Sequence, residues 1–180
     1  MKHLYKIILL YFGFAAFAHA KPLDKIIESE TNNIFAEQRA DFQEGNALIR
    51  KSIVELIGIR NEDFETPEYI LVSGCRPNSC TEKASVMFNR AGTHILGVGI
   101  LHFNCHFLLR EKEIGEDNVR LQEVRPPQKC DKDPTLTVYV IRNKKNKIGE
   151  LPERKVLAAI EGWAREFNFT KKDVRIWDRN

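Results

Sequence analysis

The residues with the clearest chemical potential lie between positions 75 and 80, where two cysteines enclose a polar turn. The six residues are Cys75, Arg76, Pro77, Asn78, Ser79 and Cys80. Pro77 sets φ for the second position of a β-turn, and Asn78 tolerates the third. Apolar, strand-forming residues precede and follow the turn, at 69–72 and 86–88. The pattern therefore predicts two strands joined by a crosslinked loop.

A disulfide between Cys75 and Cys80 would close a short ring, which stabilises a fold by only about 2 kcal/mol on the chain-entropy estimate. Its larger effect would be to hold the exposed turn in one shape. A loop held in this way can enter the cleft of a partner with little loss of conformational freedom. The chemistry predicted for this stretch is therefore recognition. The alternative is a stapled hairpin that has no partner.

Cys105 and Cys130 complete an even set of four cysteines. In an exported protein an even count favours disulfides over free thiols. Four cysteines allow three disulfide pairings. The turn favours Cys75–Cys80, which leaves Cys105–Cys130. The second bridge would stabilise the fold by about 3.5 kcal/mol on the same estimate. The sequence has no Cys-x-x-Cys motif, so a thioredoxin-type redox role has little support.

Two histidines, His102 and His106, lie close to Cys105 and to His94, which is the composition of a metal or nucleophile site. On a strand, however, His102 and His106 would be about 13 Å apart, so one ion could not reach both. Cys105 would face the opposite side and is claimed by the predicted disulfide. A nearby acidic cluster lacks the spacing of a calcium loop, and its members are Glu111, Glu113, Glu116 and Asp117. We therefore predict no metal, no cofactor and no enzymatic activity.

Residues 1–20 have the pattern of a secretory signal peptide. Lys2 and Lys6 form a positive start, an apolar stretch follows at 7–18, and Ala20 ends a small-x-small cleavage site. The stretch is short for a bilayer span, and an uncleaved anchor is the alternative. Because no later segment is apolar for long enough, we expect no stable membrane anchor. Residues 21–180 then form a single domain.

The charge balance argues against partners that are recognised by overall field. The formal net charge is +3, and removal of Lys2 and Lys6 with the leader leaves the chain near neutral. A basic stretch at 142–147 has no interleaved aromatic residues, so nucleic acid is not an expected partner. Recognition would have to depend on a local surface.

The hydrophobic periodicity predicts helices at both ends of the chain around a run of strands. We expect helices at 23–45, 46–58 (with Asn46 as N-cap) and 152–167, strands at 69–74, 82–90, 119–124, 135–142 and 173–177, a hairpin turn at 90–93 and a polar loop at 60–67. Residues 94–110 are expected to form one long strand or a pair of strands, with a bend at Gly97 and Gly99. The predicted fold class is α+β, with a central antiparallel sheet flanked by the terminal helices and stapled by two disulfides.

Residues 69–101 resemble the Ivy family, periplasmic inhibitors of vertebrate-type (C-type) lysozyme. The resemblance lies in Tyr-Ile-Leu-Val-Ser-Gly-Cys-Arg-Pro-Asn-Ser-Cys at 69–80, Ala-Ser-Val-Met-Phe at 84–88 and Gly97 in an apolar strand. The family carries Cys-Lys-Pro-His-Asp-Cys at the loop. Here Asn78 stands where that family has its inserting histidine, and Ser79 stands where it has the aspartate.

The resemblance implies a periplasmic protein that inserts the 75–80 loop into the cleft of lysozyme or a related peptidoglycan-cleaving enzyme. It also implies that a homodimer can form. Asn78 can donate a hydrogen bond to the carboxyl groups of such a cleft but cannot become cationic, and Arg76 is the candidate for the missing charge. The alternative is an envelope protein that keeps an Ivy-like scaffold, binds another partner and does not inhibit C-type lysozyme.

Overall fold

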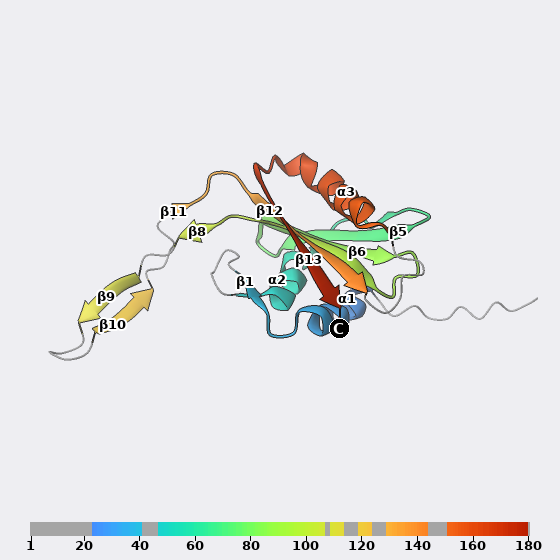
Figure 1. Ribbon diagram of the computed structural model, residues 1–180. Coiled ribbons are helices and arrows are strands. Elements are labelled where there is room, and N and C mark those ends of the chain that lie inside the picture. The colour runs from blue at the N-terminus through green and yellow to red at the C-terminus, as the bar shows by residue number, and fades with distance from the viewer. Residues whose placement is uncertain are drawn as a thin grey trace, which may run out of the picture.

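The computed structural model of the chain describes residues 23–40, 47–106, 109–113, 119–123, 129–143 and 151–179 (Figure 1). The predicted signal peptide, its cleavage site and the lysine-rich part of the basic stretch lie outside these residues. In chain order the elements are α1 (Leu23–Phe35), β1 (Arg39–Ala40), β2 (Ala47–Leu48), α2 (Ile49–Leu56), β3 (Ile59–Arg60), β4 (Phe64–Glu65), β5 (Tyr69–Arg76), β6 (Ser79–Asn89), β7 (Ile95–His102), β8 (Cys105–His106), β9 (Leu109–Glu113), β10 (Val119–Glu123), β11 (Lys129–Cys130), β12 (Thr135–Asn143), α3 (Glu153–Ala164), the 3-10 helix η1 (Arg165–Phe167) and β13 (Lys171–Arg179).

A seven-stranded sheet forms the centre of the molecule, in the order β13-β12-β7-β6-β5-β3, with β4 also paired to β5. The helices α1 and α2 cover one face and α3 covers the other (Figure 1). The predicted α+β class with a mostly antiparallel central sheet is confirmed. The exception is β13, which runs parallel to β12. Two parallel neighbouring strands need a long crossover connection. The helix α3 lies in this connection, so β13 begins at the same end of the sheet as β12.

The α1 and α2 face is closed by an aromatic cluster. The ring of Phe35 lies 5.1 Å from that of Tyr139 and 5.4 Å from that of Trp177. The Trp177 indole N–H donates a 3.0 Å hydrogen bond to the carbonyl of Ile34. These contacts join the last strand to the first helix, so the two ends of the described fold stabilise each other.

Two glycines let α3 lie close to the sheet on the other face. A Cβ at Gly97 would lie 2.5 Å from Val156 Cγ1, and one at Gly99 would lie 2.4 Å from Ile160 Cγ2. The bend predicted at these glycines is only a register shift between β6 and β7 near Gly97. Their main physical role is therefore the close helix approach, which any side chain at these positions would prevent.

The first predicted helix is too long. The helix α1 ends at Phe35, because Ala36 takes a positive φ of 42° and turns the chain toward β1. The helix α2 begins at Ile49 with Leu48 as N-cap and no side-chain cap hydrogen bond. The predicted cap, Asn46, lies outside the described residues, and β2 occupies the positions that follow it.

Two other predicted segments divide differently from the expectation. The polar segment 60–67 contains the end of β3 and the short strand β4. The segment 94–110, predicted as one long strand or a pair of strands, contains three strands, β7, β8 and the start of β9. The β9–β10 hairpin stands apart from the main sheet (Figure 1). The turn predicted at 90–93 is confirmed, with Gly92 at φ 66°.

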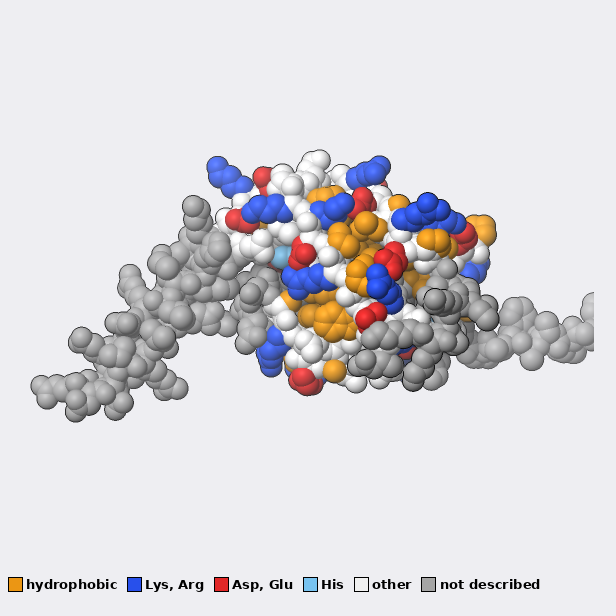
Figure 2. Space-filling model, viewed as in Figure 1, with side chains coloured by type: hydrophobic (Ala, Val, Ile, Leu, Met, Phe, Trp, Pro, Cys, Tyr) orange, Lys and Arg blue, Asp and Glu red, His pale blue; other side chains and the backbone are white. Residues whose placement is uncertain are grey.

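The edge strand β13 carries a mixed surface. Val174 and Ile176 are 39% and 43% exposed, and charged side chains lie between and beside them. Figure 2 shows hydrophobic, basic and acidic side chains interspersed on this side of the molecule. Charges along an edge strand disfavour pairing with another sheet. The homodimer implied by the family resemblance stays a prediction.

Candidate functional site

The predicted loop forms the tip of the hairpin made by β5 and β6. The two strands pair from Tyr69 with Asn89 to Arg76 with Ser79, which leaves only Pro77 and Asn78 in the turn. Asn78 has a φ of 67°, and a proline followed by a residue of positive φ is typical of a type II turn. Both turn residues are exposed. The local prediction of a strand, a Pro-Asn turn and a second strand is confirmed.

The disulfide between Cys75 and Cys80 is present, with a Cα–Cα separation of 4.9 Å. Cys75 is 6% exposed and Cys80 is exposed, so the bridge joins the buried end of β5 to the outer start of β6. The ammonium group of Lys83 donates a hydrogen bond to the carbonyl of Cys80. The first of the two predicted disulfides is thus confirmed.

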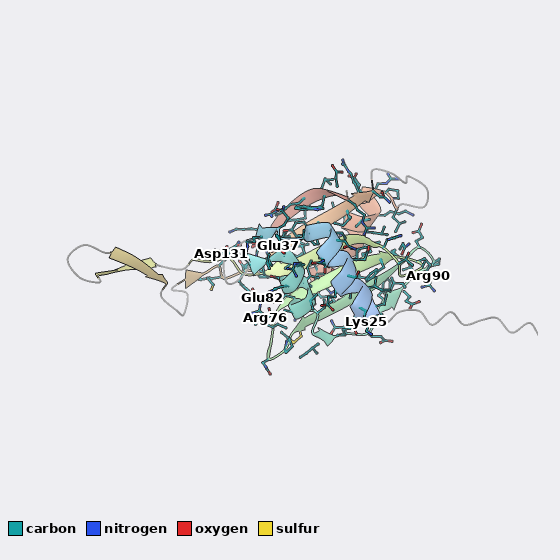
Figure 3. All side chains as sticks on the ribbon, turned by 90° about the horizontal axis from the view of Figure 1, so that it is seen from below. Lys25, Glu37, Arg76, Glu82, Arg90 and Asp131 are labelled. Carbon is teal, nitrogen blue, oxygen red and sulfur yellow. A yellow bond between two sulfur atoms is a disulfide. The ribbon has the colours of Figure 1, made fainter. Side chains whose placement is uncertain are left out.

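Arg76 points back toward the body of the molecule and not out of the loop. Its Nε lies 3.2 Å from a carboxylate oxygen of Glu55 in α2, and its Nη2 lies 3.7 Å from Oε2 of Glu82. Only 19% of the Arg76 side chain is exposed. Figure 3 shows the labelled Arg76 and Glu82 near each other. Two carboxylates of the same chain therefore face the Arg76 charge in this structure. Its role toward a partner stays a prediction.

Glu82 is a buried acidic residue beside the loop that the sequence did not single out. Its side chain is 2% exposed, and Oε1 accepts a 3.4 Å hydrogen bond from the backbone N–H of Phe103. An available signal was its place in β6, where positions 84, 86 and 88 alternate into the core and position 82 continues that face. A carboxylate on an inward position needs a cation, and Arg76 supplies it.

The turn after α2 packs against the 75–80 loop. A Cβ at Gly58 would lie 2.9 Å from Cδ of Pro77, so this glycine lets the proline ring pack against the turn. A Cβ at Gly74 would lie 2.5 Å from the carbonyl oxygen of Ile59. Both glycines permit backbone approaches that a side chain would block. The loop is therefore held by the disulfide, by the Arg76 ion pairs and by this packing.

Beside the loop lies a groove of about 1000 Å³, between α3 with η1 on one wall and β4 with β5 on the other. The two half-cystines Cys75 and Cys80 close one part of its lining. Its aromatic residues are Phe64, Tyr69, Trp163 and Phe167, and its polar residues are Asn61, Glu62, Ser73, Lys83 and Glu166. Sequence reasoning did not find this groove, because its walls come from segments about a hundred residues apart.

The histidine considered as a metal ligand belongs to the core. His102 is 4% exposed, and its Nε2 lies 2.9 Å from the Thr137 hydroxyl. Burial and the nearby charge of Arg175 lower its pKa to about 4, so the ring is neutral at pH 7. His94 lies elsewhere, 3.6 Å from Glu30. Among the described residues no group of three histidine, cysteine or acidic side chains could hold a metal ion.

The remaining predicted site residues lie in the part of the chain beyond β7. The backbone register places Cys105 directly opposite Cys130 across β8 and β11. The second disulfide stays a prediction that this register favours. Glu111 and Glu113 lie in β9, whereas Glu116 and Asp117 fall outside the described residues.

Within the described part of the chain, none of the helices has the length and apolar character needed to span a bilayer. No family model matches this sequence, and no curated protein or solved structure matches it significantly. The resemblance of residues 69–101 to the Ivy family therefore enters as a proposal. The geometry of the loop carries that proposal.

Proposed function

We propose that this chain is an exported, Ivy-like inhibitor of a lysozyme or a related peptidoglycan-cleaving glycosidase. In this proposal the 75–80 loop enters the active-site cleft of the target, and the chain itself carries no catalysis. The single observation that carries the proposal is the exposed Pro77-Asn78 turn. It stands at the tip of a long hairpin and is fixed by a disulfide, by an ion pair with a buried carboxylate and by packing on Gly58.

A fixed turn suits a cleft that holds two carboxyl groups. Glycosidases place such groups on either side of the scissile bond, and a rigid donor between them would both block the sugar and satisfy the acids. Asn78 is exposed, and its side-chain amide N–H groups can donate to a carboxylate. Because the loop is already ordered, binding would require little further loss of conformational entropy.

The tip of the loop carries no free positive charge, which favours a target that does not depend on a cationic loop. Asn78 is neutral, and Arg76 is engaged by Glu55 and Glu82. A charge-assisted hydrogen bond is roughly twice as strong as a neutral one. We therefore expect weak inhibition of C-type lysozyme and stronger inhibition of another wall-lytic enzyme of the periplasm.

The experiment is a titration of the purified protein, without residues 1–20, against a panel of wall hydrolases. The panel contains C-type, G-type and I-type lysozymes and bacterial lytic transglycosylases, and the readout is residual wall-degrading activity. Asn78→Asp is the test variant, because it puts a negative charge at the tip and should abolish inhibition. Arg90→Glu is the surface control, in the turn that follows the opposite end of β6. If the wild type is folded and inert against every member, the inhibitor proposal fails and the alternative of a scaffold for another partner takes its place.

Export to the periplasm is part of the same proposal. It rests on the leader pattern and on the disulfide at 75–80, which an oxidising compartment would preserve. Expression of the full chain in a Gram-negative host, followed by N-terminal sequencing of the periplasmic fraction, tests it. A mature chain that starts at Lys21 is expected. Recovery of the intact chain in the cytoplasm would contradict it.

A further inference from the structure

We propose that the groove between α3 and the β4–β5 edge is a binding site for a short, uncharged oligosaccharide. This site is separate from the turn that the inhibitor proposal uses, although Cys75 and Cys80 border both. The proposal rests on the shape of the groove, on the arrangement of its aromatic rings and on its polar groups. It does not depend on whether the loop inhibits an enzyme.

The groove exists because α3 leaves part of the sheet uncovered. Val156, Ile160 and Ala164 pack against β7, β12 and β6, and the β5 edge with β4 continues beyond the helix. Gly162 lines the groove, and a Cβ at this position would meet no atom within 4 Å. The volume of about 1000 Å³ is at the upper end of the range for small-molecule sites, which is room for more than one sugar ring.

Aromatic rings stand on both walls of the groove. On the helix wall the Trp163 and Phe167 ring centroids are 5.6 Å apart, and on the strand wall those of Phe64 and Tyr69 are 6.2 Å apart. Phe64 is 56% exposed, so its ring is accessible to a ligand in the groove. The C–H faces of a pyranose ring pack well on such aromatic surfaces, so both walls can take the apolar faces of a sugar.

The polar groups of the groove are mixed in sign and in hydrogen-bonding character. Glu62 and Glu166 are exposed and have no ion-pair partner among the described residues, so their carboxylates are available as acceptors. Lys83 lies 5.0 Å from the centre of the Phe167 ring, and the Asn61 amide donates a 3.2 Å hydrogen bond to the Ser73 hydroxyl. The groove thus offers both donors and acceptors.

This mixture favours a neutral ligand that has many hydroxyl groups. The carboxylates of Glu62 and Glu166 disfavour an anionic ligand, and the ammonium group of Lys83 offsets part of their attraction for a cation. A hydroxyl group both donates and accepts, so it can pair with either kind of side chain. A short oligosaccharide combines such hydroxyls with apolar ring faces. An extended peptide would match the aromatic walls as well, and it is the competing occupant in the test.

The test is calorimetric titration of the folded protein with two probes, chitotetraose and cellotetraose. Phe64→Ala removes an exposed ring and should weaken binding about threefold to tenfold, the range that one aromatic contact provides. Gly162→Leu puts a side chain into open space and should abolish binding while the protein stays folded. Ile176→Ala, an exposed apolar residue on β13, is the matched control and should bind as the wild type does.

NMR chemical-shift changes locate the bound probe on the molecule. Changes confined to α3, β4 and β5 support the proposal. Failure of both probes to bind saturably, or binding that Gly162→Leu leaves intact, overturns it, as does a groove that takes an unstructured peptide but neither sugar. Gly162→Leu leaves the Pro77-Asn78 turn unchanged, so the enzyme panel reports on the inhibitor proposal independently.

Discussion

Replacement of Glu82 by Gln is the sharpest test of how the loop is held. Breaking a buried ion pair by removing one partner costs about 3–5 kcal/mol. The Arg76 guanidinium is 19% exposed and keeps Glu55 as a second partner at 3.2 Å, so part of that cost is offset. We therefore expect Glu82→Gln to lower the free energy of unfolding by about 2–3 kcal/mol, which is less than the cost of breaking a fully buried pair.

Glu55→Gln is the matched control, because the same guanidinium loses a carboxylate that is 55% exposed. An exposed pair contributes at most about 1 kcal/mol. Urea unfolding followed by circular dichroism measures both variants, and the midpoints are compared at unchanged slope. If Glu82→Gln costs no more than Glu55→Gln, the buried carboxylate does not hold the loop base and the account of Arg76 is wrong.

The other predictions concern the turn, the buried histidine and the second disulfide. Asn78→His should strengthen inhibition of C-type lysozyme about tenfold to a hundredfold through an imidazolium–carboxylate bond of about 1.5–3 kcal/mol. This gain should fade as pH rises above the pKa of the bound imidazole. An inhibition curve that does not change would show that no carboxylate of the target faces the tip of the loop. Asn78→Gly should leave stability almost unchanged, whereas Asn78→Ala should cost about 1 kcal/mol because alanine resists the φ of 67°, and equal unfolding midpoints would contradict the turn geometry. The pKa of His102 is lowered to about 4, so the unfolded chain takes up the proton first and the free energy of unfolding should fall as pH drops from about 6.5 to 4. Over that pH range His102→Gln should lose about 2–3 kcal/mol less of its free energy of unfolding than the wild type does. Urea unfolding at several pH values measures both proteins, and equal losses would refute the neutral buried ring. Non-reducing peptide mapping should recover Cys105 linked to Cys130, and a free thiol at either position would exclude the pairing that the backbone register favours.

The loop was predictable because its conformation depends on neighbours in the sequence. Pro77 limits its own φ, and Asn78 is one of the few residues that accept a positive φ. The two strands were predictable from their apolar residues for the same reason. The clearest helix was also found, since the apolar stripe of α3 repeats at helical spacing.

The boundaries of α1 and α2 could not be read from periodicity alone. The apolar spacing continues past Phe35, but Ala36 takes a positive φ, and β1 pairs with β2 across residues that the pattern assigned to helix. Helix propensity is a weak preference that such pairing overrides. The number of strands after the 90–93 turn could not be predicted for a similar reason, because β8 pairs with β11 and β9 pairs with β10.

What the sequence by itself determined is the set of local conformations: the Pro-Asn turn, the apolar strands around it and the last helix. Only the tertiary structure decided which distant groups meet. It placed β13 parallel to β12, turned Arg76 onto the buried Glu82 and brought Phe64 and Trp163 to opposite walls of one groove. The physical reason is that such contacts join residues far apart in the chain, and their geometry depends on how the helices pack on the sheet and not on any local preference.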